Sequence, residues 1–459
     1  MTPHASIAVI GAGIAGLAAA YDLIEAGHSV TIYEAAPEVG GLAAGFKAPH
    51  WDWTLEKFYH HWFASDKHML GLIDRLGWRD DVLFPRPYTV VYYEGKFYPL
   101  DSYVEAAKFT LTKFGPLGLV RFGATGVYLR MTSNWQPLEK VTADTWMRRA
   151  VGTRIYNALW RPLLVGKFGE ENLDVVNMAW MWARIHARTT RLGTFVGGFQ
   201  AFLNRFAARL RDGGVTLRLN TRVTQISPAQ PDEAGKLAVH TADDRMLYDA
   251  VLSTSSPALM ARLTPDLPAD YSARLAALKS IGAVVLVVTL DRQLTQYYWH
   301  SLPKEAGFPY LAMVEHTNFI GPEHYGGDHI LYLGDYLEPD HEYFHLSKEE
   351  LLERFLPSLL RFNPDFDRSW VKDSWLWRAA YAQPVPPVNH SQNIPSIRTP
   401  LPGLYFASMS QVYPWDRGTN FAVEIGRRAA RLMLEDSAQG QLAPRMDYGG
   451  VTTADRPPG

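Results

Sequence analysis

The sequence predicts an α/β protein in which a Rossmann-like nucleotide-binding domain is interleaved with an α+β domain. The chain opens with a strand, a glycine-rich turn, a helix and a second strand, and two later segments return to the same alternation. A mainly helical stretch and a strand-rich stretch lie between these segments. With 459 residues, the chain is long enough for more than one domain. We expect the nucleotide domain to comprise residues 1–87, 192–260 and 396–435, and the second domain residues 88–191 and 261–395.

The glycine-rich turn follows directly on the apolar strand 6–10 and has the spacing G-x-G-x-x-G. Gly11 permits the tight turn, Gly13 lets a pyrophosphate approach the backbone, and Gly16 lets the next helix pack close to the strand. That helix, residues 14–26, directs its N-terminal amides and the positive end of its dipole at the phosphates. The residues expected at the phosphates are Gly11, Gly13, Ile14, Ala15 and Gly16.

The second strand, residues 29–33, ends at an acidic residue. Glu34 lies 23 positions after Gly11, where an acid of this motif takes the hydroxyl pair of a ribose. A glycine pattern alone is a weak signal, but strand, helix, second strand and terminal acid together indicate a dinucleotide site.

The composition excludes several classes of protein. Lys and Arg total 45 against 47 for Asp and Glu, so there is no basic field to attract nucleic acid. The chain contains no cysteine, which excludes disulfides, thiolate metal ligands, a Cys nucleophile and a Cys-linked cofactor. Redox chemistry would therefore need a bound cofactor. The apolar N-terminus lacks the basic region of a signal peptide, and we expect a cytoplasmic protein.

The segments after the opening unit predict an aromatic layer, a hairpin and a helical region. Residues 51–63 are rich in aromatic and His side chains, which suits packing beside a flat ligand. Residues 88–100 have the pattern of a β-hairpin that turns at Glu94-Gly95. From residue 102 to 191, apolar side chains recur at helical spacing.

The longest apolar-leaning stretch, residues 111–131, is too polar to cross a membrane. Lys113, Pro116, Arg121 and Arg130 interrupt it, and a spanning helix would bury these charges at a large cost. A buried helix that roofs a substrate cavity is the favoured interpretation. A helix that lies on a membrane surface is the alternative, so peripheral membrane contact stays open.

The second half of the chain mixes strands and helices. A helix that starts at Gly197-Gly198 is stopped by Gly213-Gly214. The tail, residues 436–459, is polar and rich in Gly and Pro, and we expect it to be disordered. Further strands are expected at 215–219, 222–227, 236–241, 249–254, 283–290, 329–333 and 403–407, and further helices at 348–360 and 419–434.

These separated elements together resemble the FAD-dependent superfamily that includes amine oxidases, protoporphyrinogen oxidases, carotenoid desaturases and UDP-galactopyranose mutases. The resemblance covers residues 6–434 and implies a GR2-type flavoprotein fold with FAD as the cofactor. The elements that carry it are the glycine turn with Glu34, Gly40-Gly41, Gly197-Gly198-Phe199, Pro402-Gly403-Leu404-Tyr405-Phe406-Ala407 and Gly426-Arg427-Arg428-Ala429-Ala430. No Cys exists and no His lies in the C-terminal strand and helix junction, so the FAD would be held non-covalently.

The resemblance implies two backbone contacts to FAD outside the opening unit. Gly40, Gly41 and Leu42 would run close to the diphosphate and the ribityl chain, where a Cβ would clash. Val223 would contact the adenine side through its backbone.

It also implies contacts from the last strand and helix. The amides of Gly418, Thr419 and Asn420 would lie at the flavin C2 carbonyl, where the helix dipole favours the reduced flavin. The acid that usually meets the ribityl hydroxyls is replaced here by a Ser-Met-Ser sequence, so Ser408 or Asp416 would take that contact.

Different members of the superfamily match different segments. Amine oxidases usually carry a Lys in the strand that here spans 282–286, and this strand has none, which argues against amine oxidation. Residues 377–384 are similar to protoporphyrinogen oxidases and related desaturating enzymes, whereas residues 56–63, 95–100 and 184–188 are similar to UDP-galactopyranose mutases.

The resemblance therefore predicts an FAD-dependent oxidoreductase. Hydride or electrons would pass from an unidentified small organic substrate to flavin N5, with oxygen or another compound as the acceptor. The alternative is a mutase-like isomerase of sugar nucleotides that uses reduced FAD without net redox change. A binding protein with a purely structural flavin is a third hypothesis.

Five side chains lie in segments that the family places near the isoalloxazine: Tyr59, His61, Trp377, Tyr413 and Trp415. Of these, Tyr59, His61, Trp377 and Tyr413 are the candidates for lining the flavin or the substrate. His60 and His61 would face opposite ways on a strand and have no further ligands at metal spacing, so we expect no metal site.

Overall fold

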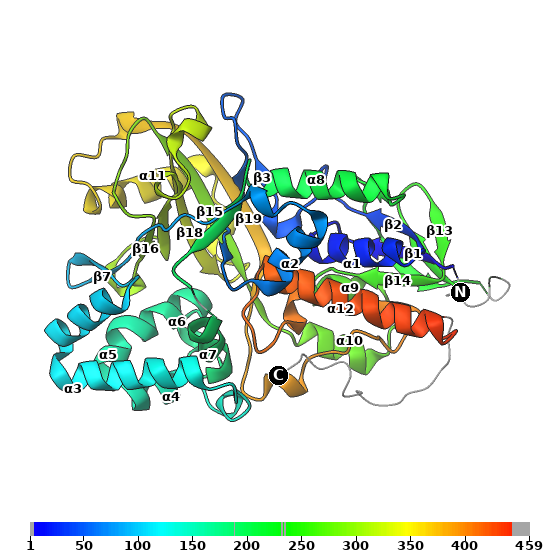
Figure 1. The fold of residues 1–459 in the computed structure, drawn as a ribbon, viewed down its shortest axis with the longest axis horizontal. Helices are drawn as coiled ribbons and strands as arrows, with labels where there is room; N and C mark the ends of the chain where they lie inside the picture. Colours follow the sequence, from blue (N-terminus) through cyan, green and yellow to red (C-terminus); the bar gives the residue numbers. More distant parts are fainter. Residues whose placement is uncertain (1–3, 188, 231–232, 234–235, 443–459) are drawn as a thin grey trace.

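The computed structural model describes residues 4–442 except 188, 231–232 and 234–235. Figure 1 shows two halves side by side: a parallel sheet covered by helices, and a larger mixed sheet with a group of helices beside it. Both sheets are assembled from segments that lie far apart in the sequence.

The parallel sheet has the strand order β10-β2-β1-β14-β20. Every neighbouring pair in it is parallel, as the predicted βαβ unit requires. Its strands come from three separate parts of the chain: β1 (Ser6–Ile10), β2 (Ser29–Tyr33), β10 (Thr216–Arg218), β14 (Ala250–Ser253) and β20 (Leu404–Phe406). A Rossmann-like domain assembled from separate segments is thereby confirmed, while the detailed domain boundaries stay a prediction.

Alternate side chains of β1 bury into opposite faces of this sheet. Ile7 and Val9 join the apolar core of one face, and Ala8 and Ile10 join that of the other. The first face packs against α1 (Ile14–Glu25), α2 (Lys67–Leu76), α8 (Phe199–Asp212) and α12 (Thr419–Ala438). The second face packs against β11 (Gln225–Pro228), β12 (Leu237–His240), β13 (Arg245–Tyr248), α9 (Pro257–Leu263) and α10 (Ala269–Ala276).

The mixed sheet has seven strands in the order β19-β15-β18-β17-β16-β7-β8. The predicted hairpin is confirmed at β7 and β8, with Glu94 and Gly95 both at positive φ in the turn. The strands are β7 (Thr89–Tyr93), β8 (Lys96–Pro99), β15 (Ser280–Leu290), β16 (Trp299–Ser301), β17 (Ala312–Glu315), β18 (His329–Leu337) and β19 (Val371–Pro384). Shorter strands are β3 (Gly45–Phe46), β4 (Leu55–Glu56), β5 (Trp62–Phe63), β6 (Val82–Leu83) and β9 (Leu192–Phe195).

Helices flank the mixed sheet. On one face lies α11 (Lys348–Phe355), which begins with a capping box of Ser347 and Glu350. The predicted helical region consists of α3 (Tyr103–Met131), α4 (Ala143–Val151), α5 (Thr153–Ile155), α6 (Arg161–Phe168) and α7 (Met178–Ala187). These helices form the lower left part of Figure 1, with α3 at the outer edge.

The structure corrects the favoured interpretation of residues 111–131. This stretch lies within α3, which bends at Gly115, and much of its apolar surface is exposed: Leu117 is 72% and Val120 65% accessible. It therefore does not roof a cavity with a buried apolar face. Helical spacing predicted the helix correctly but could not tell which surface its apolar face meets. No helix of the described chain is both long and apolar enough to cross a membrane.

Several element boundaries differ from the predictions. Val223 precedes the strand in which it was expected, because β11 begins at Gln225. The helix expected at 348–360 is α-helical only to Phe355 and continues as a 3-10 helix. The last helix continues to Ala438, where Asp436 is buried and accepts hydrogen bonds from Arg398. The rest of the predicted disordered tail, from residue 443, lies outside the described residues.

Candidate functional site

The glycine turn between β1 and α1 has an open surface. Gly11 has a φ of +106°, which favours glycine, and a Cβ there would lie 2.5 Å from Thr254 Oγ1. A Cβ on Gly16 would lie 2.0 Å from the carbonyl oxygen of Gly11, so Gly16 permits the close packing of α1. A Cβ on Gly13, in contrast, would have no heavy atom of the described residues within 4 Å. The turn is thus closed on the protein side and open at Gly13, at the N-terminus of α1.

Glu34 is positioned beside this turn by backbone hydrogen bonds. Its Oε2 accepts from the amide of Ala12 at 2.8 Å and its Oε1 from the amide of Ala36 at 2.9 Å. A carboxylate oxygen has a second lone pair, so both oxygens can still accept from a ligand hydroxyl. The amide of Thr221 donates to the carbonyl of Glu34 at 2.8 Å, which brings the segment that contains Val223 next to the acid.

A second glycine pair faces the first turn. The amide of Gly40 donates to the carbonyl of Ala12 at 2.9 Å, and Gly40 and Gly13 form an isolated parallel bridge. Gly40 and Gly41 have φ values of +129° and +57°, and a Cβ on Gly41 would lie 3.5 Å from the Cα of Gly13. The 3-10 turn that contains Leu42 follows directly. Two glycine backbones therefore face each other without side chains between them, and this cradle fits a diphosphate.

The N-terminus of α12 lies at the other end of this site. A Cβ on Gly418 would also find no described heavy atom within 4 Å. The next two side chains already accept hydrogen bonds from the protein. Thr419 Oγ1 accepts from Trp62 Nε1 at 3.0 Å, and Asn420 Oδ1 accepts from the amides of His68 and Met69. The backbone amides of this first turn remain the groups that can meet a flavin carbonyl.

The two residues expected at the ribityl chain are both engaged elsewhere. Ser408 forms a capping box with Gln411. Asp416 accepts from Trp180 Nε1 at 3.0 Å and from Arg184 Nη1 at 2.6 Å. Either side chain could contact the ribityl chain only in addition to these hydrogen bonds, and the assignment stays a prediction.

Next to Gly418, a group of charged and phenolic side chains joins α12 to the mixed sheet. Arg417 donates through Nε to Gln383 on β19 at 3.0 Å and through Nη2 to the hydroxyl of Tyr336 on β18. The Nζ of Lys167, on α6, lies 4.5 Å from the centre of the Tyr336 ring. We call Lys167, Arg184, Tyr336, Asp416 and Arg417 the Arg417 cluster.

The charges of this cluster shift one another's protonation. Burial raises the pKa of Tyr336, but the charges of Arg417 and Lys167 outweigh burial and lower it to about 8. Burial lowers the pKa of Lys167, Tyr336 and Asp416 oppose this shift and Arg184 and Arg417 add to it, and together they hold the pKa at about 8. Burial would raise the pKa of Asp416, but Arg184, Lys167 and Arg417 hold it at about 2. The cluster thus has a surplus of positive charge at neutral pH.

Tyr59, one of the side chains expected at the flavin or the substrate, lies near Tyr336 and Arg417 of the cluster. Its ring packs across Gly334 of β18, where a Cβ would lie 2.8 Å from Tyr59 Cε1. Burial, with a contribution from Tyr336, raises its pKa well above the ordinary value. The neighbouring His60 donates through Nδ1 to the carbonyl of Phe58, and burial lowers the pKa of His60 to about 4, so the ring is neutral at pH 7.

Trp377 lies on β19 of the same sheet. Lys57 Nζ lies 5.0 Å from the centre of its ring, and the Phe46 ring centre lies 5.1 Å away. Its Nε1 is buried and donates to no atom of the described residues. An unused buried donor at this position is consistent with a ligand contact.

The other two predicted residues are His61 and Tyr413. The ring of His61 packs against Phe63 and Tyr298. Tyr413 is 2% exposed and belongs to the core of the helical region, and its hydroxyl donates to Glu139 and accepts from Asn177. Tyr413 also borders a narrow cavity together with Asp416 and Arg417, and a catalytic part for it stays a prediction.

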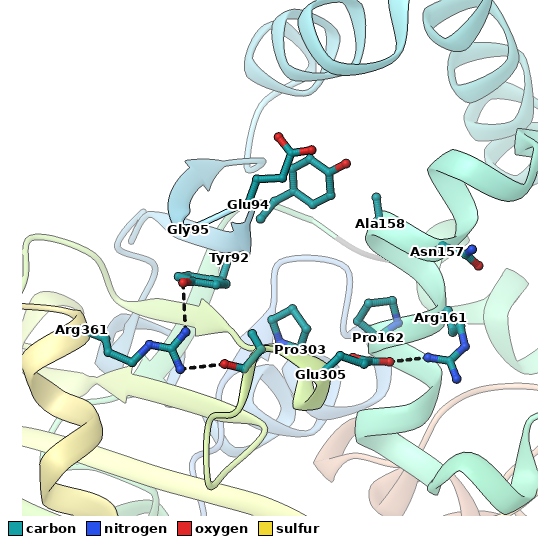
Figure 2. A pocket seen from close by; sticks show the side chains of 12 residues that line it. Tyr92, Glu94, Gly95, Asn157, Ala158, Arg161, Pro162, Pro303, Glu305 and Arg361 are labelled. Atoms are coloured by element: carbon teal, nitrogen blue, oxygen red, sulfur yellow. Dashed lines mark hydrogen bonds and ion pairs between the residues drawn. The ribbon is translucent and has the colours of Figure 1, made fainter.

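Two cavities differ in their relation to this site. A narrow one of about 20 Å³ borders Trp180, Gln383, Asp416 and Arg417. A larger one of about 580 Å³ lies between the β7–β8 hairpin, the helical region and Arg361 (Figure 2). None of the predicted site residues lines the larger cavity. Its arginines are also engaged, because Arg361 donates to Tyr92 and Ala306, and Arg161 pairs with Glu305. We therefore place the candidate active site at the Arg417 cluster.

Sequence reasoning missed Lys167, Tyr336, Arg417 and His60. Arg417 follows Asp416 and precedes the glycine of the α12 N-terminus, which is a signal that could have drawn attention to it. Lys167 and Tyr336 carry no local signal, because only the packing of α6 on β18 brings them together. Among residues 4–442 that the structure describes, no group of three or more His, Asp or Glu could hold a metal ion.

Fold and site together define a dinucleotide-binding flavoprotein with a separate substrate domain. The family model described as flavin containing amine oxidoreductase matches residues 14–434, and the chain belongs to this family. The protein is an FAD-dependent oxidoreductase that holds its cofactor non-covalently.

Individual relatives are distant. A provisionally named zeta-carotene desaturase of Synechococcus elongatus is 21% identical over 94% of this chain and 99% of the relative. A provisionally assigned protoporphyrinogen oxidase from Exiguobacterium sp. 255-15 has a similar structure, with a TM-score of 0.74, 18% identity, and coverage of 95% of this chain and 100% of that one. Reduced UDP-galactopyranose mutase gives a TM-score of 0.71 at 15% identity and covers 97% and 100%. The structural similarities support the fold, and the reaction must be argued from the site.

Proposed function

We propose that this enzyme dehydrogenates an organic substrate that carries an acidic group, such as a carboxylate or phosphate. The observation that carries this proposal is the Arg417 cluster, which lies between the N-terminus of α12 and the faces of β18 and β19. Bound FAD would accept the hydrogen and the electrons that the substrate loses, with oxygen or another compound as the final acceptor.

The charge of the cluster favours an acidic substrate group. Lys167, Arg184 and Arg417 contribute three positive charges, and Asp416 is held as their one carboxylate counterion. A substrate carboxylate or phosphate would balance the remaining charge and accept charge-assisted hydrogen bonds from Lys167. The same positive charge would repel a substrate ammonium group. This is a second argument against amine oxidation, beside the absence of Lys from residues 282–286.

The pKa of Lys167 also lies close to neutral pH. Because its pKa is lowered to about 8, it is mostly charged at pH 7 and mostly neutral at pH 9. We therefore expect kcat/KM for an acidic substrate to fall as the pH rises through about 8. In Lys167→Met activity should be low, and the step that remains should come from Tyr336 and lie at higher pH, because Lys167 is one of the charges that lower the pKa of Tyr336.

The experiment is an anaerobic screen of candidate donors for bleaching of the flavin absorbance. Acid-bearing donors should bleach the wild type, and Lys167→Met should slow bleaching by about tenfold or more, since it removes one charge-assisted contact. Lys236→Met is the matched control, because Lys236 precedes β12 and pairs with Asp249, which precedes β14 of the parallel sheet. Donors with an ammonium group that bleach the wild type and Lys167→Met equally would contradict the proposal.

The mutase-like reaction remains the second candidate, favoured by the cationic groups that a diphosphate could also meet. In the mutase-like segment 184–188, the resemblance implies that Arg184 and Arg188 meet a sugar-nucleotide diphosphate; the structure describes Arg184, and Arg188 lies outside the described residues. Calorimetric titration of UDP into dithionite-reduced protein tests it. We expect no measurable binding, because Arg184 is held by Asp416 at 2.6 Å. Micromolar UDP binding that Arg184→Ala abolishes would make the mutase-like reaction the leading one. A cytoplasmic location stays a prediction.

A further inference from the structure

One helix carries most of the large apolar side chains that this protein exposes. Of the twelve such side chains found exposed among the described residues, eight belong to α3. Contiguous exposed apolar surface on this scale marks a contact with another molecule or with lipid. The eight are Tyr103, Val104, Leu111, Leu117, Val120, Val127, Tyr128 and Met131.

The exposed side chains form one face of the helix. After the bend at Gly115, exposed residues recur three and four positions apart from Leu117 to Met131. The buried positions Gly118, Thr125 and Leu129 follow the same period on the opposite face. The inner face therefore packs on the protein, and the outer face is not covered by any described residue. The helix itself runs along the edge of the molecule in Figure 1.

The part of the chain that carries this face is rich in basic residues. From residue 103 to 154 the chain has eight Lys and Arg against three Asp and Glu, although the whole chain has a net charge of −2. Arg121 donates to the backbone carbonyls of Arg149 and Ala150, which places it at the end of α4, and the guanidinium of Arg154 lies 5.5 Å from the centre of the Phe114 ring. The positive charge is thus shared between α3 and the α4–α5 segment that contacts it, and three of the eight basic residues, Lys108, Lys113 and Arg148, pair with acidic side chains.

We propose that α3 and the adjoining α4–α5 turn dock this enzyme on the surface of an anionic lipid bilayer. The outer face of α3 would enter the boundary between headgroups and acyl chains, and the basic side chains would contact anionic headgroups. Tyr128, whose ring stacks on Trp146 at a centroid distance of 5.9 Å, supplies the aromatic groups suited to that boundary. A second copy of this chain is a poorer occupant, because two surfaces with this excess of positive charge would repel each other.

The test is flotation of the FAD-loaded protein with vesicles of phosphatidylcholine alone or mixed with phosphatidylglycerol. We expect the wild type to float with the anionic vesicles and to be released by high salt. The double variant Leu117→Asp/Val120→Asp should lower the partition coefficient by about tenfold or more. The variant Arg149→Glu/Arg154→Glu should lower binding to anionic vesicles specifically.

The matched control is Met246→Asp/Leu360→Asp, which places the same charges at exposed apolar positions outside α3. It should bind vesicles as the wild type does, and retained flavin absorbance will show that each variant is folded. A wild type that does not bind anionic vesicles would overturn the proposal, as would equal binding by the α3 variants. A wild-type dimer in sedimentation that Leu117→Asp/Val120→Asp converts to a monomer would assign the face to a second copy instead.

Discussion

The variant Gly13→Val separates cofactor binding from folding. Gly13 has an extended conformation with a φ of −71°, which valine can adopt, and a Cβ at this position would have no heavy atom of the described residues within 4 Å. The apoprotein should therefore tolerate the change within about 0.5 kcal/mol. The new side chain would instead fill the space that the cofactor diphosphate needs, so the purified variant should be colourless.

The expected difference in Tm follows from the stabilisation of the folded state by bound FAD. At FAD concentrations about a hundredfold above Kd, the wild type gains about 2.7 kcal/mol of stability from binding. With an unfolding entropy of about 2 cal/mol/K per residue, this corresponds to a rise in Tm of about 3 °C for a chain of this length. The variant should lack this rise while its apoprotein Tm matches that of the wild-type apoprotein.

The assay is thermal unfolding followed by circular dichroism, with and without added FAD, together with the flavin absorbance of the purified protein. Gly16→Ala is the contrasting variant, because its Cβ would lie 2.0 Å from the Gly11 carbonyl oxygen and should destabilise the apoprotein itself. Full FAD occupancy in Gly13→Val would refute the placement of the diphosphate. A large loss of apoprotein stability in Gly13→Val would refute the description of the turn as open.

Three further predictions concern single side chains. Glu34→Ala removes the acceptor of two backbone amides and should lower apoprotein stability by about 1–3 kcal/mol and weaken FAD binding, as measured by urea unfolding and by FAD titration, whereas Glu34→Gln should retain most of the stability. Burial raises the pKa of Glu56 to about 7. The protonated Glu56 side chain therefore contributes stability to the folded protein that is lost as the pH rises from about 4.5 to 7. Relative to the wild type, Glu56→Gln should be more stable at pH 8 than at pH 5, by at most about 3 kcal/mol, as measured by urea unfolding at both pH values. Trp377→Phe removes a donor that has no partner among the described residues, so its unfolding midpoint should stay close to that of the wild type while the flavin spectrum or substrate KM changes; an unchanged spectrum and KM would show that the indole meets no ligand.

The fold of the FAD-binding half could be predicted because the signals of its opening unit are local. The turn from Gly11 to Gly16 requires glycines for reasons of backbone conformation and close packing, and Glu34 ends a strand that pairs directly with β1. Such constraints act over a few residues and are visible in the sequence itself.

The Arg417 cluster could not be predicted because its members meet only in three dimensions. Lys167 comes from α6, Tyr336 from β18 and Arg417 from the residue before Gly418, and no spacing along the chain relates them. The resemblance directed attention to Tyr413, which lies in the core of the helical region and borders the narrow cavity beside Asp416 and Arg417. In the same way, the apolar periodicity of α3 predicted a helix without showing whether protein or another surface would cover it.

The order of strands in the parallel sheet has a consequence for biosynthesis. β1 is the first strand of the parallel sheet to be synthesised. β14, which pairs with β1, is synthesised only after the helical region, and β20, which pairs with β14, only after the mixed sheet as well. A nascent chain therefore holds Ile7 and Val9 without the α12 surface that later covers them. The cofactor cradle is also incomplete until Gly418 and the first turn of α12 have left the ribosome, so FAD capture must follow the synthesis of nearly the entire described chain.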